Sequence, residues 1–136
     1  MAQLVHRHSG GTILVVDDDA VMCRTLCRLL KGHGYEVHFA SDGSQAINRA
    51  ESEPPDLVLL DLNLPDIDGL LVCQALRADP RTAHIPIIVL TARDGVENER
   101  KSRAAGASEY VSKPFDVHTL LGRVNLYITS QRVGGN

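Results

Sequence analysis

The stretch LVLLDLNLPDIDG, residues 57–69, places an aspartate directly after a continuous apolar run. Apolarity that does not alternate is typical of a strand buried on both faces, as in a parallel sheet. Residues 13–16 and 87–90 form similar runs, and shorter, more mixed runs at 36–40 and 109–112 are expected near the sheet edges. The sequence therefore predicts five strands, with 57–60 at the centre.

Helical spacing of apolar residues separates these strands. It predicts helices over 19–31, 43–52, 67–77 and 96–105, and a last helix that Asp116 caps. Strands that alternate with helices indicate an α/β fold with a central parallel sheet and right-handed crossovers. We expect residues 1–11 to form a flexible leader, 12–130 one domain, and 131–136 a C-terminal tail or the start of a linker.

Composition narrows the classes of function. The 136 residues carry a net charge of −3, which does not support direct binding to nucleic acid. No apolar run approaches the length of a membrane span or a signal peptide, so we expect no membrane partner and a cytoplasmic location. Three cysteines without CxxC spacing indicate neither a disulfide framework nor a zinc site.

Polar residues follow four of the predicted strands: Asp17-Asp18, Asp61, Thr91 and Lys113. Ligands of open α/β sheets bind outside the carboxyl ends of the strands, so these side chains can meet in space. Crowded carboxylates repel each other, by roughly 4 kcal/mol per pair at 4 Å and an effective dielectric near 20. A hard divalent cation such as Mg²⁺ would relieve that repulsion, and the lysine and hydroxyl could hold phosphoryl oxygens.

The chain resembles the receiver domain of two-component response regulators over about residues 11–130. The resemblance rests on four motifs in order: ILVVDDD at 13–19, LLDLNLPDIDG at 59–69, VLTA at 89–92 and GASEYVSKPF at 106–115. It implies a flavodoxin-like, doubly wound, five-stranded parallel sheet with strand order 2-1-3-4-5 and five helices.

The resemblance also implies that Asp61 accepts a phosphoryl group from the phosphohistidine of a histidine kinase or a phosphotransfer protein. A Mg²⁺ or Mn²⁺ ion would be held by Asp18, Asp61 and the backbone carbonyl of Asn63, with Asp17 assisting through water. The chain would then be no enzyme toward other substrates, catalysing only its own phosphorylation and dephosphorylation.

Further roles follow from the same resemblance. Thr91 and Lys113 would contact the phosphoryl oxygens, and Tyr110 matches an aromatic switch position that turns inward as the threonine moves. The Lys113-Pro114 bond matches a junction that is usually cis. The switch would change the face formed by helix 96–105, strand 109–112 and the last helix, for an output domain, an output protein or a homodimer.

Other interpretations compete with this one. Asp17, Asp18 and Asp19 could form a helix-capping cluster, which describes Asp19 well but leaves Asp61 and Lys113 unexplained. A flavodoxin-like cofactor protein would need a Gly-, Ser- or Thr-rich loop after the first strand. An aspartate-nucleophile phosphatase would match Asp17-x-Asp19 but not the Asp61 motif.

A phosphorylation-dead receiver that acts only as a binding module is a further alternative; the complete site argues against it, and a measured absence of Mg²⁺ binding would favour it. Half-buried aromatics are common in strands, so the switching role of Tyr110 rests on the resemblance. The sequence contains no output domain, so the chain is either a stand-alone receiver or a piece of a longer regulator, and we lean slightly toward a piece.

Overall fold

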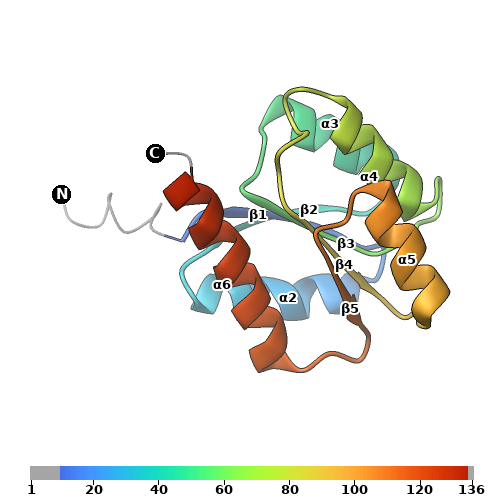
Figure 1. Cartoon of the computed structure of the whole chain (residues 1–136). Coiled ribbons are helices and arrows are strands. Elements are labelled where there is room, and N and C mark those ends of the chain that lie inside the picture. Colours follow the sequence, from blue (N-terminus) through green and yellow to red (C-terminus); the bar gives the residue numbers. More distant parts are fainter. Residues whose placement is uncertain (1–9, 135–136) are drawn as a thin grey trace.

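A computed structural model describes residues 10–134, so most of the predicted leader and residues 135–136 lie outside it. The described strands are β1 (Thr12–Val16), β2 (Glu36–Ala40), β3 (Leu57–Leu60), β4 (Ile87–Thr91) and β5 (Glu109–Ser112). They form one parallel sheet in the order β2-β1-β3-β4-β5 (Figure 1). This confirms the predicted fold and strand order, with the two mixed strands at the edges.

The described helices are α2 (Ala20–Gly32), α3 (Gly43–Ser52), α4 (Gly69–Ala78), α5 (Val96–Ala105) and α6 (Val117–Gly134). Helices α2 and α6 cover one face of the sheet, and α3, α4 and α5 cover the other (Figure 1). The backbone of α6 stays helical to Gly134, into the segment expected to be a tail. Among residues 10–134, no helix is both long and apolar enough to cross a membrane.

The start of α4 differs from the sequence-based prediction, which placed it at residue 67. Asp68 has an extended backbone, and its side chain accepts the N–H of Leu70, so it is the N-cap and the helix begins at Gly69. Asp19 caps α2 in the same way, accepting the N–H groups of Val21 and Met22. Aspartate side chains therefore define helix starts that apolar spacing alone places too early.

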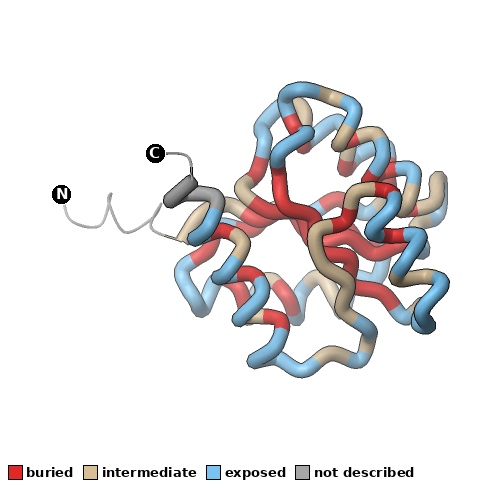
Figure 2. Tube along the Cα trace, in the orientation of Figure 1, coloured by how far each residue is buried: buried red, intermediate tan, exposed pale blue. Residues whose placement is uncertain are grey.

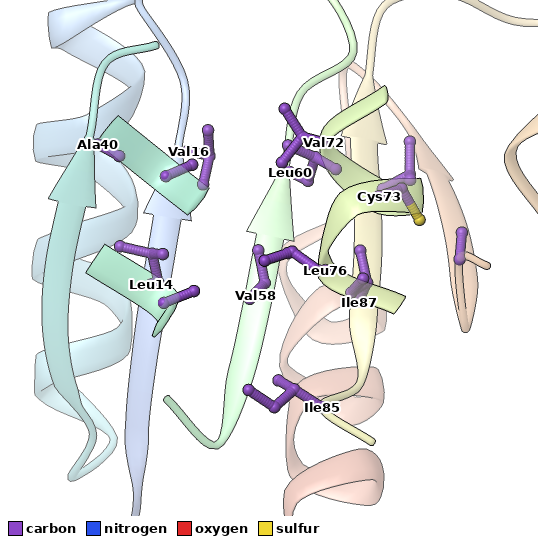
Figure 3. Close-up of a cluster of buried hydrophobic side chains, with 14 of the residues drawn as sticks. Leu14, Val16, Ala40, Val58, Leu60, Val72, Cys73, Leu76, Ile85 and Ile87 are labelled. Atoms are coloured by element: carbon purple, nitrogen blue, oxygen red, sulfur yellow. The ribbon is translucent and has the colours of Figure 1, made fainter. Parts of the chain in front are cut away.

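The sheet separates two buried apolar layers, and its strands are largely buried (Figure 2). Alternate residues of β1, β3 and β4 face opposite layers because successive side chains of a strand point to opposite faces. One layer joins these strands to α3, α4 and α5, and Figure 3 shows its residues from Leu14 to Ile87. The other joins them to α2 and α6 through Leu26, Leu30, Leu120, Val124 and Ile128. Packing on both faces fixes the strands whose ends carry the polar residues.

Arg77, near the end of α4, fixes the segment that leads into β5. Its Nε donates to the carbonyl of Gly106 at 2.9 Å, and its Nη1 donates to the carbonyl of Ile85 at 2.6 Å. Gly106 ends α5 in the left-handed region, at φ 115°, and a Cβ atom there would lie 2.5 Å from Arg77 Cγ. The C-terminal end of α5 is therefore held tightly against α4.

Candidate functional site

Asp17, Asp61 and Lys113 meet at the carboxyl ends of the strands, as the sequence predicts. The two aspartates follow the neighbouring strands β1 and β3. Lys113 follows β5, and its Nζ lies 2.7 Å from Asp17 Oδ2 and 3.2 Å from Asp61 Oδ2. The Lys113-Pro114 peptide is cis, as the resemblance implies. One ammonium group thus bridges two carboxylates that are distant in the sequence.

The second oxygen of each carboxylate is held by the backbone two residues further on. Asp17 Oδ1 accepts the N–H of Asp19 at 3.0 Å, and Asp61 Oδ1 accepts the N–H of Asn63 at 3.1 Å. Only 3% of Asp17 and 7% of Asp61 is exposed to solvent. Hydrogen bonds to both oxygens offset the cost of burying these charges and fix the orientation of each group.

The charge of Lys113 is favoured by its surroundings. Burial alone would lower the pKa of this amine, but the hydrogen bond to Asp17 and the charges of Asp61 and Asp17 outweigh burial and raise the pKa. Lys113 therefore stays protonated as a hydrogen-bond donor throughout the neutral range.

The other predicted site residues make no described hydrogen bond to the Lys113 ammonium group, although the backbone N–H of Lys113 donates to the carbonyl of Thr91 at 2.8 Å. Thr91 is fully buried at the end of β4, and its Oγ1 accepts the N–H of Arg93 at 3.3 Å. Asp18 is exposed, and so is Asn63, whose side chain turns toward Arg93. The structure thus brings the side chains of Asp17, Asp61 and Lys113 together, whereas Asn63 and Thr91 contact them through their backbones.

Arg93 is a residue that the sequence analysis missed. Its Nε donates to Asn63 Oδ1 at 2.7 Å, and its Nη2 donates to Asp68 Oδ2 at 3.0 Å, so it bridges the β4–α5 and β3–α4 loops. Burial would raise the pKa of Asp68, but the N–H of Leu70 and the Arg93 guanidinium lower it. The sequence feature that could have pointed to this contact is a single cationic residue in the loop after Thr91, together with the acidic residues of the loop after β3.

Tyr110 on β5 is half-buried against the layer under α3, α4 and α5. Its hydroxyl donates to the backbone carbonyl of Arg93. Burial, together with the charges of Asp94 and Glu99, raises the pKa of this hydroxyl, so it remains a donor at neutral pH. Arg93 therefore touches both residues of the predicted switch through its backbone, Thr91 through the N–H and Tyr110 through the carbonyl.

The donor set fits a hard divalent cation. Within residues 10–134, no three His, Cys, Asp or Glu side chains converge on one point. Mg²⁺ does not require three, because it is usually bound by one or two carboxylates and completes its shell with water, carbonyl and phosphate oxygens. Asp17 and Asp61 carry two negative charges against the single positive charge of Lys113, so the cluster keeps an excess of negative charge for a cation to offset.

Comparison with known proteins decides the family. The model of the response regulator receiver domain matches residues 13–125, which include every residue of the centre described above. The chain belongs to the response regulator receiver domain family. Phosphorylation-based two-component signalling is the known role of this family, and binding of Mg²⁺ is typical of it.

Relatives and solved structures agree with this assignment. The receiver domain is 43% identical over 112 residues to the DNA-binding dual master transcriptional regulator RpaA of Synechocystis sp., a match that covers 82% of this chain and 46% of RpaA. A CheY-like receiver domain protein of Methanospirillum hungatei superposes with a TM-score of 0.84 at 30% identity, covering 93% of this chain and 99% of that one. The receiver domain thus spans about half the length of such a curated relative.

One solved neighbour bears on the metal. The receiver domain of the sensor histidine kinase PA1611 of Pseudomonas aeruginosa has a magnesium ion coordinated in its active-site cleft. It superposes with a TM-score of 0.82 at 32% identity, covering 89% of this chain and 99% of that one. The family to which this receiver domain belongs therefore uses the metal that its own donor set fits.

Proposed function

We propose that Asp61 is the phosphoacceptor of this receiver domain. The observation that carries the proposal is the convergence of a buried aspartate at the end of the central strand with Asp17 and the Lys113 ammonium group. The phosphodonor would be the phosphohistidine of a histidine kinase or a phosphotransfer protein. An oxygen of Asp61 forms the new bond to phosphorus, and the phosphorus–nitrogen bond breaks with its electron pair passing to the imidazole.

The residues of the chain have separate tasks in this reaction. Asn63 N–H holds one oxygen of Asp61 so that the carboxylate presents a defined face to the phosphorus. Lys113 would donate to developing negative charge on the phosphoryl oxygens, and Thr91 would supply a hydroxyl. A Mg²⁺ or Mn²⁺ ion would be held by Asp18, Asp61 and the carbonyl of Asn63, with Asp17 assisting through water, and would neutralise charge on the transferring group.

The exposed α5–β5–α6 face is the proposed output surface. Thr91 and Tyr110 both contact the backbone of Arg93, so movement of Thr91 toward a phosphoryl group would be felt at Tyr110 and at the start of α5. The partner would be an output domain, an output protein or a second copy of the chain. The free thiols of Cys23, Cys27 and Cys73 suit a reducing compartment, and the cytoplasm is the proposed location.

The aspartate-nucleophile phosphatase is less well supported. That class would need the side chains of Asp17 and Asp19 to face one centre. Asp19 instead caps α2, while Asp17 is paired with Lys113. Phosphorylation of its own Asp61, from a phosphohistidine or a small donor, and later hydrolysis of the aspartyl phosphate are the only reactions proposed for the chain.

Intact mass after incubation with acetyl phosphate and Mg²⁺ tests the acceptor. The wild type should gain one phosphoryl group, and Asp61→Asn should gain none. Asp56→Asn is a suitable control, because Asp56 binds the N–H of Thr12 at the opposite end of β1. An equal gain in the wild type and Asp61→Asn would refute the assignment.

Amide spectra recorded with and without beryllofluoride, a mimic of aspartyl phosphate, test the switch. Shifts should extend from the loops around Asp18, Asp61 and Lys113 into residues 96–112. Shifts confined to those loops would mean that the phosphoryl group is read directly at the site, without a propagated change. Moving a switch from 1:99 to 99:1 takes about 5.5 kcal/mol of differential stabilisation.

A further inference from the structure

The loop between β3 and α4 is attached to a helix that takes no part in the centre described above. The carboxylate of Asp66 accepts the N–H groups of Gly43 at 2.7 Å, Ser44 at 2.9 Å and Ile67 at 2.8 Å. Gly43 and Ser44 are the first two residues of α3, more than 20 positions earlier in the chain. Asp66 therefore caps α3 from a different segment.

Two aspartates accept backbone hydrogen bonds at the start of α3. The N–H groups of the first turn of a helix have no partner within the helix. Asp42, the N-cap, accepts the N–H of Gln45 at 2.8 Å, and Asp66 accepts those of Gly43 and Ser44. The backbone hydrogen bonds lower the pKa of Asp66 well below its usual range, so this residue is a charged acceptor at neutral pH.

Close packing supports the same attachment. A Cβ atom on Gly43 would lie 2.4 Å from Ile67 Cγ1 and 2.9 Å from Val72 Cγ2, so the loop can approach the helix only because residue 43 has no side chain. Helix α3 is in turn fixed to the sheet by the buried Ala46 and Ala50. The loop is therefore attached to a rigid part of the fold.

The loop has a second attachment of a different kind. Asn63 and Asp68 bind Arg93, which belongs to the loop that follows Thr91 and leads into α5. This second attachment joins the β3–α4 loop to the segment expected to move. The first attachment, at Asp66, joins it to a helix that is buried against the sheet. Asn63, three residues before Asp66, also orients the carboxylate of Asp61 through its N–H.

We propose that Asp66 is a positioning residue for metal-dependent phosphorylation: it ties the β3–α4 loop to α3 and so holds the backbone of Asn63 in the place where it serves the metal and Asp61. The inference rests on the proposed function. Asp66 belongs to the loop and joins it to α3, whereas Asp42, the other cap of the same helix, makes no contact with the loop among its described hydrogen bonds. The role assigned to Asp66 therefore goes beyond helix capping.

The matched variants are Asp66→Ala and Asp42→Ala, each of which removes a carboxylate from the same helix start. Both should lower the melting temperature. Only Asp66→Ala should weaken Mg²⁺ binding, because groups that orient metal ligands typically contribute about 10–100-fold to affinity. We expect a Mg²⁺ dissociation constant about tenfold higher in an amide-shift titration, with Asp42→Ala within about twofold of wild type.

Phosphorylation by acetyl phosphate supplies an independent measurement. In Asp66→Ala, the Mg²⁺ concentration that gives half the maximal rate should rise with the dissociation constant, and saturating Mg²⁺ should restore most of the rate. Asp66→Asn keeps an oxygen acceptor and should fall between wild type and Asp66→Ala. If Asp66→Ala fails to fold, the comparison of Asp66→Asn with Asp42→Asn gives the same test with smaller effects.

Equal Mg²⁺ affinities in the Asp66 and Asp42 variants would overturn the positioning role and leave Asp66 as a helix cap alone. That result would leave the proposed function intact, since wild type would still bind Mg²⁺ and become phosphorylated. A wild-type chain that shows neither would refute the proposed function itself, and with it this inference.

Discussion

Lys113 forms ion pairs with two carboxylates from different strands while most of its side chain is buried. The pairs stabilise the fold only while the amine is charged. Its pKa is raised above the ordinary value of 10.5, so the contribution is complete at neutral pH and up to the unfolded pKa. It is lost as the pH rises through the higher folded pKa.

Lys113→Met should therefore destabilise the domain by about 2 kcal/mol at pH 8, the size expected for hydrogen bonds to charged groups. The difference from wild type should shrink above pH 10.5, where the amine of the unfolded chain begins to lose its proton while the folded chain still holds it. Urea unfolding of both proteins between pH 8 and pH 11 measures this. A difference that stays constant over that range would show that packing of the stem, not charge, accounts for the effect.

Binding of Mg²⁺ should stabilise the domain, and this effect should depend on Asp18. Mg²⁺ that binds the native state alone adds about 1.4 kcal/mol when present at ten times its dissociation constant. The melting temperature of wild type should rise with Mg²⁺, and Asp18→Ala should abolish the rise. Na⁺ at matched ionic strength serves as the control for screening. A melting temperature that ignores millimolar Mg²⁺ would argue against the site.

The residues at strand ends were predictable, and the residues between loops were not. Asp17, Asp61 and Lys113 follow buried strands, and parallel strands bring their carboxyl ends to one edge, so pattern alone places them together. Arg93 and Asp66 act through contacts with segments far from them in the chain. Nothing in their local sequence says which partner they reach, because that depends on how the loops pack.

At the scale of elements, α5 is the least anchored helix of those described. It buries only Ser102 and Ala105, while α4, also of ten residues, buries Gly69, Val72, Cys73 and Leu76. The sequence of α5, VENERKSRAA, is mostly polar, which accounts for its small share of the core. Apolar spacing misplaced the start of α4, because a side-chain cap, rather than hydrophobic periodicity, decides where that helix begins.

Native-state amide hydrogen exchange should show the difference between the two helices. Because burial of a Val or Leu side chain contributes about 1.5–3 kcal/mol, amides of α5 should open at a free energy at least about 2 kcal/mol below those of α4. Helix α4 is the internal control, equal in length and packed on the same face. Equal protection of the two helices would contradict the idea that α5 is the easiest element to displace.

At the scale of the whole molecule, one sheet separates two apolar layers that share no side chains. Substitutions of buried residues in different layers should therefore have independent effects on the free energy of unfolding, unless the sheet itself deforms. Most element bounds could be predicted from apolar runs and their spacing, and the strand order followed from the resemblance to receiver domains. How closely the side chains of each layer pack against the sheet could not be predicted.

Val72→Ala on α4 and Val124→Ala on α6 remove fully buried side chains from opposite layers. Each should cost about 2 kcal/mol, and the double variant should equal the sum within about 0.5 kcal/mol. Denaturant unfolding of the four proteins closes the cycle. A larger coupling would show that a cavity on one face is relieved by movement of the strands toward the other.

The two ends of α5 are held very differently. Gly106 is pinned by Arg77, whereas the helix starts at Gly95 without a side-chain cap. The helix then behaves as a lever with its pivot at the C-terminal end. Since ten residues span about 15 Å, a tilt of about 10° would carry the first turn about 2.6 Å and leave the last turn in place. A partner that contacts Val96 would sense such a tilt, and one that contacts only Ala105 would not.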